Sequence, residues 1–150
     1  NGKTTTVTLI DLLARAAGAS VFLGGNIGTP FADYAFEVLA SVTITTPPQG
    51  AMATGPVKVC LATSGVEVEP AKNGVNDGKG HHHLLIDVAL PRDLSKPIGK
   101  DANHIHMGDG STCKEIKLSS GKHTVRALFA KGNHVPYDPA LTTEVTFNVK

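Results

Sequence analysis

Tryptophan is absent from this chain of 150 residues, and aromatic residues make up only 5% of it. Proteins that bind single-stranded nucleic acid stack bases on aromatic side chains, so this scarcity disfavours that class. The charge balance disfavours it too, because 14 lysines and arginines face 13 aspartates and glutamates. A nearly neutral chain has little attraction for a phosphate backbone or an anionic lipid surface. We therefore expect no nucleic-acid partner.

Long apolar runs are also missing. No stretch approaches the roughly 20 consecutive apolar residues that cross a bilayer, so the sequence predicts no membrane span. The opening residues lack the order of a basic, an apolar and a cleavage region, and no intact secretory signal is visible in them. Apolar residues nevertheless make up 41% of the chain, which is enough for a domain with its own core.

Cysteine is scarce, with Cys60 and Cys113 as the two examples and no C-x-x-C pair. Two cysteines are too few for a disulfide scaffold. Two interpretations stay open, namely two buried thiols or one bridge that closes a long loop. Such a bridge would stabilise the fold by roughly 4 kcal/mol through loop-closure entropy and would indicate an oxidising compartment.

The hydrophobic pattern divides the chain into two parts. Over residues 3–17 apolar side chains recur at three- and four-residue steps and stop at Gly18, which is typical of a helix. SVFLGG, residues 20–25, reads as a short buried strand. The first 40 residues are therefore predicted to be an α/β-type extension with one helix and one short strand.

From Ser41 onward the pattern changes to short alternating runs, such as SVTIT, VKVCLAT, HHLLIDVAL and TTEVTFNVK. The run KEIKLSSGKHTVRALFA reads as strand, tight turn, strand. Short strands separated by turn signals predict an antiparallel β-sandwich. The expected fold is mainly β, with residues 41–150 as one sandwich domain and residues 1–40 as a segment that is not an independent domain.

The opening NGKTTTVTLIDLLARAAGASVFLGGNIGTP resembles the ATP-binding core of the Mur ligase family, and within it the UDP-N-acetylmuramoylalanine–D-glutamate ligases. In that family a glycine-rich loop holds phosphates through backbone N–H groups and a lysine, and a hydroxyl reaches Mg²⁺. Lys3 and Thr4 match the lysine and the hydroxyl. The resemblance covers residues 1–37 and lacks the strand before the loop, the Mg²⁺-binding acids and the substrate domains. It implies a fragment that neither binds ATP nor acts as a ligase.

An appended helix and strand with an apolar face needs a surface to pack against. The first 40 residues therefore favour a homo-oligomer or a filament that forms through this segment.

Three blocks, GHHHLLID, NHIHMGDG and SSGKHTVRALFAKGNHVPYDP, resemble a bacterial His-rich domain family of unknown function over residues 42–150. Its members are typically small exported proteins, so the resemblance implies a periplasmic or extracellular location and no known activity. ITTPPQGAMATGPVKV and LTTEVTFNV also resemble strands of bacterial immunoglobulin-like modules. That resemblance implies an Ig-like sandwich.

Histidine is the residue type that carries chemistry here, with seven in the chain. On a strand His81 and His83 lie on one face and His82 on the other, while His104 and His106 point together. Two H-x-H pairs on neighbouring strands, completed by a loop histidine, could supply most of a copper or zinc coordination shell. The predicted metal ligands, converging at one end of the sandwich, are His81, His83, His104, His106 and His134.

Other roles for these histidines stay open. They could brace loops through hydrogen bonds, with Asn103, Asp109 and Asp138 as available partners, and His123 is expected to pack or hydrogen-bond within its strand. Met107 offers a thioether that would favour copper, or it packs in the core.

Catalytic motifs are missing. Neither a G-x-S-x-G elbow nor an H-E-x-x-H pair is present, so a copper or zinc centre with an open coordination position is the remaining enzyme route. The sequence thus predicts a non-catalytic binding or structural module of the cell envelope or the extracellular space. The alternatives are a self-assembling structural subunit with loop-bracing histidines, and a small copper or zinc enzyme.

Overall fold

The computed structural model describes residues 40–150, and all that follows concerns these residues. Three predictions lie outside them, namely the helix over residues 3–17, the strand over residues 20–25 and the association surface of the first segment.

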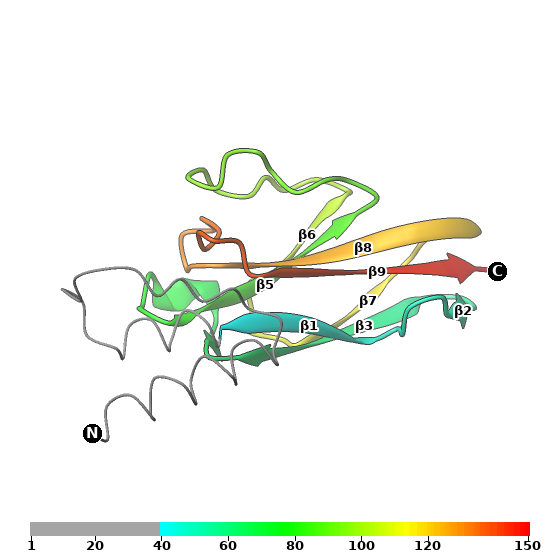
Figure 1. Ribbon diagram of the computed structural model, residues 1–150, viewed down its shortest axis with the longest axis horizontal. Coiled ribbons are helices and arrows are strands. Elements are labelled where there is room, and N and C mark those ends of the chain that lie inside the picture. Colours follow the sequence, from blue (N-terminus) through cyan, green and yellow to red (C-terminus); the bar gives the residue numbers. More distant parts are fainter. Residues whose placement is uncertain (1–39) are drawn as a thin grey trace, which may run out of the picture. The chain divides into compact units, whose positions relative to one another are not determined.

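Residues 40–150 form nine β-strands and no α-helix, with one 3-10 turn, η1, at Ala71–Asn73. Two sheets contain these strands (Figure 1). The smaller sheet has the order β1-β3-β7, with β1 at Ser41–Thr46, β3 at Val57–Ser64 and β7 at Cys113–Ile116. The larger sheet has the order β2-β9-β8-β5-β4, with β6 also paired to β5. Its strands are β2 (Met52–Ala53), β4 (Glu67–Val68), β5 (Lys79–Ile86), β6 (His104–Met107), β8 (Gly121–Ala130) and β9 (Thr142–Val149). Five of the strand pairs are antiparallel, whereas β2 with β9 and β4 with β5 are parallel.

One hydrophobic core lies between the two sheets. Alternate residues of β3 and β9 are buried, as their apolar period of two predicts. The prediction of a mainly β domain is therefore confirmed. The residues in question are Val57, Val59 and Leu61 on β3 and Val145, Phe147 and Val149 on β9.

Strand β5 lies in the interior of the larger sheet, with both of its edges paired. β8 runs along one edge, and β4 and β6 share the other. Residues 80–86 are all buried, so both faces of β5 are shielded from solvent. The strand ends at Ile86, earlier than the run HHLLIDVAL predicts, because Asp87 has a φ of 56° and turns the chain out of the sheet.

The two strands expected in KEIKLSSGKHTVRALFA are present, but they do not pair with each other. β7 pairs with β3 in the smaller sheet, while β8 pairs with β5 and β9 in the larger one. Residues 117–120 therefore carry the chain from one sheet to the other. The local pattern predicts where strands occur, but the pairing partner depends on how the two sheets close over the core.

Cys60 and Cys113 lie opposite each other on β3 and β7 and form a disulfide, which decides between the two interpretations left open above. Disulfides persist in oxidising surroundings, so the bridge indicates an oxidising, extracytoplasmic compartment. Within residues 40–150, no helix has the length and apolar character needed to cross a membrane.

We expect the disulfide to stabilise the domain substantially. It joins positions separated by 53 residues. Closing a loop of that size removes entropy from the unfolded chain worth about 4 kcal/mol. Urea unfolding with and without a reductant, alongside a Cys60→Ala, Cys113→Ala double variant, measures this loss. An unchanged midpoint after complete reduction would contradict the expectation.

Candidate metal centre

Four histidine side chains meet on the outer face of the larger sheet, away from the core. His81 and His83 extend from β5, His106 extends from β6, and His134 comes from the loop after β8. One nitrogen from each ring can be chosen so that all four lie within 4.8 Å of one another. In Figure 1, β6 and the connection before it lie above β8, on the side away from β1 and β3.

Strand alternation and register place the first three of these rings. His81 and His83 are two residues apart and so share the face opposite His82. The antiparallel pairing of β5 with β6 then sets His106 directly across from His83. The centroids of the His83 and His106 rings are 5.1 Å apart.

The fourth ring arrives through a tight loop. β8 ends at Ala130, which pairs with His81. The chain then turns back, and the His134 N–H group donates to the Lys131 carbonyl over 2.8 Å. With a φ of 66°, His134 has a left-handed backbone conformation that is uncommon outside glycine. Its Nδ1 lies 3.1 Å from His81 Nε2.

Two glycines leave room for this arrangement. A Cβ at Gly108, just after β6, would overlap the ring of His106. A Cβ at Gly132, two residues before His134, would overlap the carbonyl of Gly74 in the neighbouring loop. Side chains at Gly108 and Gly132 would therefore push His106 and His134 out of the cluster.

Burial keeps the imidazoles of His81, His83 and His106 neutral. His81 is 0% exposed and His83 is 2% exposed, whereas His106 and His134 are half-buried. Burial, together with the neighbouring imidazoles, lowers the pKa of His81 to about 4 and that of His83 to about 3. Burial also lowers the pKa of His106. Neutral imidazole is the form that ligates metals, so this group presents lone pairs at pH 7.

Hydrogen bonds between the rings cannot satisfy all the nitrogens of this cluster. His81 Nε2 lies 3.0 Å from His83 Nε2 and 3.1 Å from His134 Nδ1. A ring nitrogen has either one hydrogen or one lone pair, so it forms one good hydrogen bond and not two. Three further buried ring nitrogens, on His81, His83 and His106, have no partner among the residues that the structure describes. Unsatisfied buried polar atoms are rare and destabilising, so this group calls for an explanation.

The fifth predicted ligand, His104, is not in the cluster. Alternation puts it on the same side of β6 as His106, but it pairs with Leu85 and not with His83. Its Nδ1 lies 2.8 Å from Asp101 Oδ1, and this bond is the main cause of a lowered pKa at Asp101.

His82 and Met107 lie on the opposite face, in the core. They pair across β5 and β6, and Met107 is 1% exposed. The His82 ring contacts Phe129 with centroids 5.2 Å apart. The packing interpretation of Met107 is therefore confirmed, and its sulfur is not beside the histidine cluster.

His123 is held by acceptors at both ring nitrogens. Nδ1 lies 2.7 Å from Asp87 Oδ2, and Nε2 lies 2.9 Å from the Ser119 carbonyl oxygen. Because a carboxylate and a carbonyl only accept, both ring nitrogens donate when the imidazole is protonated. The bond to Asp87 accordingly raises the pKa of His123. Burial raises the pKa of Asp87, but hydrogen bonds from Thr124 and His123 lower it overall.

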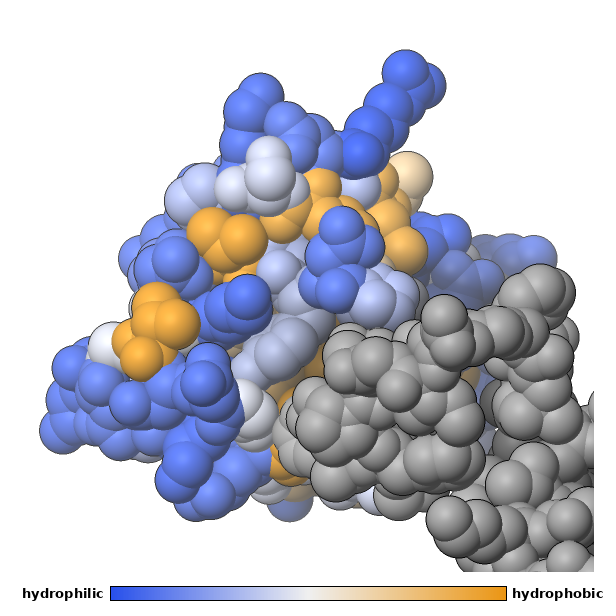
Figure 2. Space-filling view, turned by 60° about the vertical axis from the view of Figure 1, so that its left-hand side comes forward, coloured by the Kyte–Doolittle hydropathy of each residue, from blue (hydrophilic) through white to orange (hydrophobic). Residues whose placement is uncertain are grey.

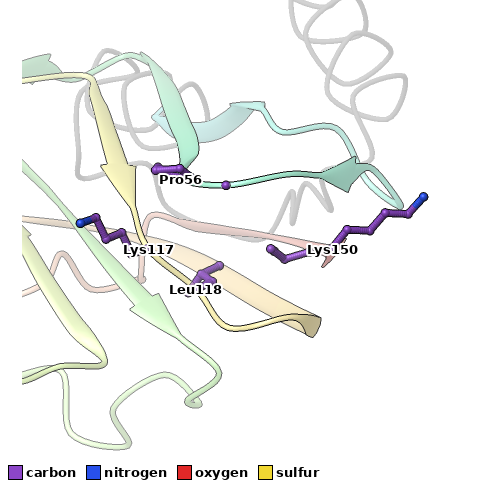
Figure 3. Close-up of a pocket in the computed structure, with 6 residues that line it drawn as sticks. Pro56, Lys117, Leu118 and Lys150 are labelled. Carbon is purple, nitrogen blue, oxygen red and sulfur yellow. The ribbon is translucent and has the colours of Figure 1, made fainter.

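Other surface features offer less chemistry than the histidine cluster. A hollow of about 300 Å³ lies between Pro56, Leu118 and the C-terminal end of β9, and its two lysine amines, on Lys117 and Lys150, point away from each other (Figure 3). On the face shown in Figure 2, apolar atoms occur in small areas between hydrophilic ones. Scattered apolar areas of this kind are normal for a protein surface.

The fold and the cluster define a two-sheet β domain with a four-histidine group on the outer face of its larger sheet. The chain belongs to the family described as a domain of unknown function (DUF4399), which matches residues 59–150. The match includes all four clustered histidines and confirms the resemblance noted for this part of the sequence. No solved structure matches the chain.

Several curated proteins that match the chain are UDP-N-acetylmuramoylalanine–D-glutamate ligases. The one from Oleidesulfovibrio alaskensis is 60% identical over 40 residues, which are 27% of this chain and 9% of the ligase. The one from Nitratidesulfovibrio vulgaris is 60% identical over 38 residues, or 25% and 8%. The one from Marinobacter nauticus is 46% identical over 61 residues, or 35% and 14%. The chain therefore spans less than a sixth of the length of these ligases, and the Mur ligase resemblance is confirmed as a short, partial one.

The ion pair of His123 with Asp87 predicts a pH-dependent stability. Because the folded state raises the pKa of His123, the pair stabilises below the unfolded value of about 6.5 and is lost as pH rises through the folded value. At the acid end, the contribution of Asp87 is lost as pH falls through its lowered pKa. Asp87 is partly exposed, so we expect at most about 1 kcal/mol. Urea midpoints of the wild type and His123→Gln should differ at pH 6 and converge by pH 9. A difference that persists or grows with pH would refute this assignment.

Proposed function

We propose that residues 41–150 form a non-catalytic, Ig-like module of the cell envelope or the extracellular space. In this proposal it binds one copper or zinc ion through His81, His83, His106 and His134. The observation that carries the proposal is the convergence of four imidazoles in which His81 Nε2 faces two other ring nitrogens, a contact set that one hydrogen or one lone pair cannot satisfy. A cation at the centre accepts all four lone pairs together and removes the conflict at His81 Nε2.

The spacing of the nitrogens supports a metal. Four nitrogens about 2.0–2.1 Å from a tetrahedral ion lie about 3.3 Å from each other. The observed contacts of 3.0 and 3.1 Å, within a group that spans 4.8 Å, are close to that arrangement. Three of the rings are fixed by strands and the fourth by a constrained loop backbone, so small rotations of the imidazoles suffice to reach it.

The donor set narrows the choice of metal. All four donors are imidazole nitrogens, which suit copper and zinc, and both cysteines are used in the disulfide. At equal free concentrations of the two ions, copper should outcompete zinc, because the affinity of divalent metals for nitrogen ligands is higher for copper than for zinc. His104 is left out of the proposed shell, because it pairs beyond the cluster and bonds to Asp101.

Copper should stabilise the protein if this proposal holds. At a free concentration 100 times the dissociation constant, binding adds about 2.7 kcal/mol, which is roughly 10 °C in melting temperature for a chain of this size. His83→Gln should abolish the increase, and His123→Gln, which removes a histidine outside the cluster, should keep it. Elemental analysis of protein purified without an affinity metal column gives a second readout. If histidines only brace loops, His83→Gln lowers the melting temperature equally with and without Cu²⁺, and the proposal fails.

A second test of the copper-binding proposal uses Gly108→Ala, a variant that keeps every histidine. The added methyl group occupies the position of the His106 ring, and the backbone of Gly108 lies outside the left-handed region, so alanine fits the chain itself. We expect this variant to fold and to show a smaller copper-dependent increase in melting temperature than the wild type. An undiminished increase would argue against His106 as a ligand.

Two expectations for the first 40 residues rest on sequence resemblance and amphipathic pattern. We propose that this segment does not bind ATP and that it promotes self-association of the chain. Calorimetric titration with ATP should show no heat, and sedimentation should detect species larger than a monomer. Saturable ATP binding that is lost in Lys3→Ala contradicts the first expectation, and a purely monomeric chain contradicts the second.

A further inference from the structure

His104 has the features of a metal ligand without being in the cluster. It lies on the same side of β6 as His106, two residues before it, which is about 7 Å along a strand. Its side chain is 25% exposed, whereas His81 and His83 are 0% and 2% exposed. An ion that arrives from solution can therefore meet His104 before it meets the nitrogens of His81 and His83. His106 and His134 are half-buried, as His104 is.

Asp101 orients the His104 ring so that Nε2 is the nitrogen free to bind a metal. Oδ1 of Asp101 accepts from His104 Nδ1 over 2.8 Å and also from the backbone N–H groups of Asn103 and His104, over 2.8 and 3.0 Å. A carboxylate on Nδ1 fixes the proton there and leaves the lone pair on Nε2 free. Metal-ligating histidines commonly have such a carboxylate partner, because it orients the ring and makes it more basic.

The four clustered histidines lack this support. Within residues 40–150, none of them is hydrogen-bonded to a carboxylate, and the Nδ1 atoms of His81 and His83 have no partner at all. The imidazole with a carboxylate partner on this face is thus the partly exposed His104, whereas the two least accessible imidazoles, His81 and His83, have none. This division separates the capture of an ion from its final coordination.

We propose that His104, positioned by Asp101, is the capture residue through which a divalent cation reaches the His81, His83, His106 and His134 site. This inference rests on the proposed metal-binding function. A hydrated ion must lose water before it enters a buried site, and one exchange for His104 Nε2 at the surface begins that process. The negative charge of Asp101 attracts the cation to the same place. His106, two residues away on the same side of the strand, is the nearest acceptor of the ion along β6.

The proposal predicts that His104 affects the rate of Cu²⁺ association and has little effect on the dissociation constant. Apo protein is mixed with Cu²⁺ in a stopped-flow instrument, and the imidazole–copper absorbance gives the association rate constant. Competition with a chelator gives the dissociation constant. We expect His104→Gln to slow association about tenfold and to change the dissociation constant less than threefold. Asp101→Asn keeps an acceptor for the two backbone N–H groups and should slow association in the same direction.

Matched controls make the outcomes decisive. His123→Gln removes a histidine that is also held by an aspartate, but outside this face, and should leave both constants unchanged. His106→Gln should weaken affinity strongly. Unchanged association in His104→Gln would overturn the capture role. A loss of affinity in His104→Gln as large as that in His106→Gln would also overturn it, because His104 would then be a ligand of the final site. If the wild type binds no copper, the proposed function itself fails, and this result is distinct from the other two.

Discussion

The pairing of β5 on both edges is the constraint on which the rest of this domain depends. β8 fixes one edge, while β4 and β6 fix the other, so the rotation of the strand about its own axis is settled. With that rotation set, the three consecutive histidines separate by face. His82 enters the core against Phe129, and His81 and His83 reach the outer face. A slip of one residue would exchange the two faces and leave no converging pair.

The same pairing buries His81 and His83, whose Nδ1 atoms then lack hydrogen-bond partners within residues 40–150. Imidazoles on a central strand lose solvent, and burial then lowers the pKa of His81 and of His83 far below the ordinary value. Neutral rings with few partners are costly to keep in a protein interior. If these histidines only braced loops, each contact between rings would need one N–H donor and one lone pair. His81 Nε2 has two such contacts but only one hydrogen or one lone pair. This conflict at His81 Nε2 is the reason for proposing a cation at the cluster.

The disulfide and the histidine cluster lie in different sheets. The disulfide joins β3 to β7 in the smaller sheet, whereas the histidine cluster lies on the far face of the larger one. The two sheets share a core, so the smaller sheet packs against the face of β5 and β8 that is opposite the histidine cluster. Rigid strands with a dedicated supporting layer are suited to holding ligands at fixed distances.

The sequence by itself determined the strands, the buried faces of β3 and β9, and the separation of His81 and His83 from His82, because each follows from a period of two along the chain. Only the tertiary structure decided that β7 pairs with β3, that Cys60 meets Cys113, and that His104 is excluded from the cluster while His134 joins it. His104 and His106 share a face by alternation, but the register against β5 sets one opposite Leu85 and the other opposite His83. His134 joins through a left-handed loop residue that no periodicity encodes. Local spacing fixes which way a side chain points, whereas register and loop closure depend on residues far apart in the chain.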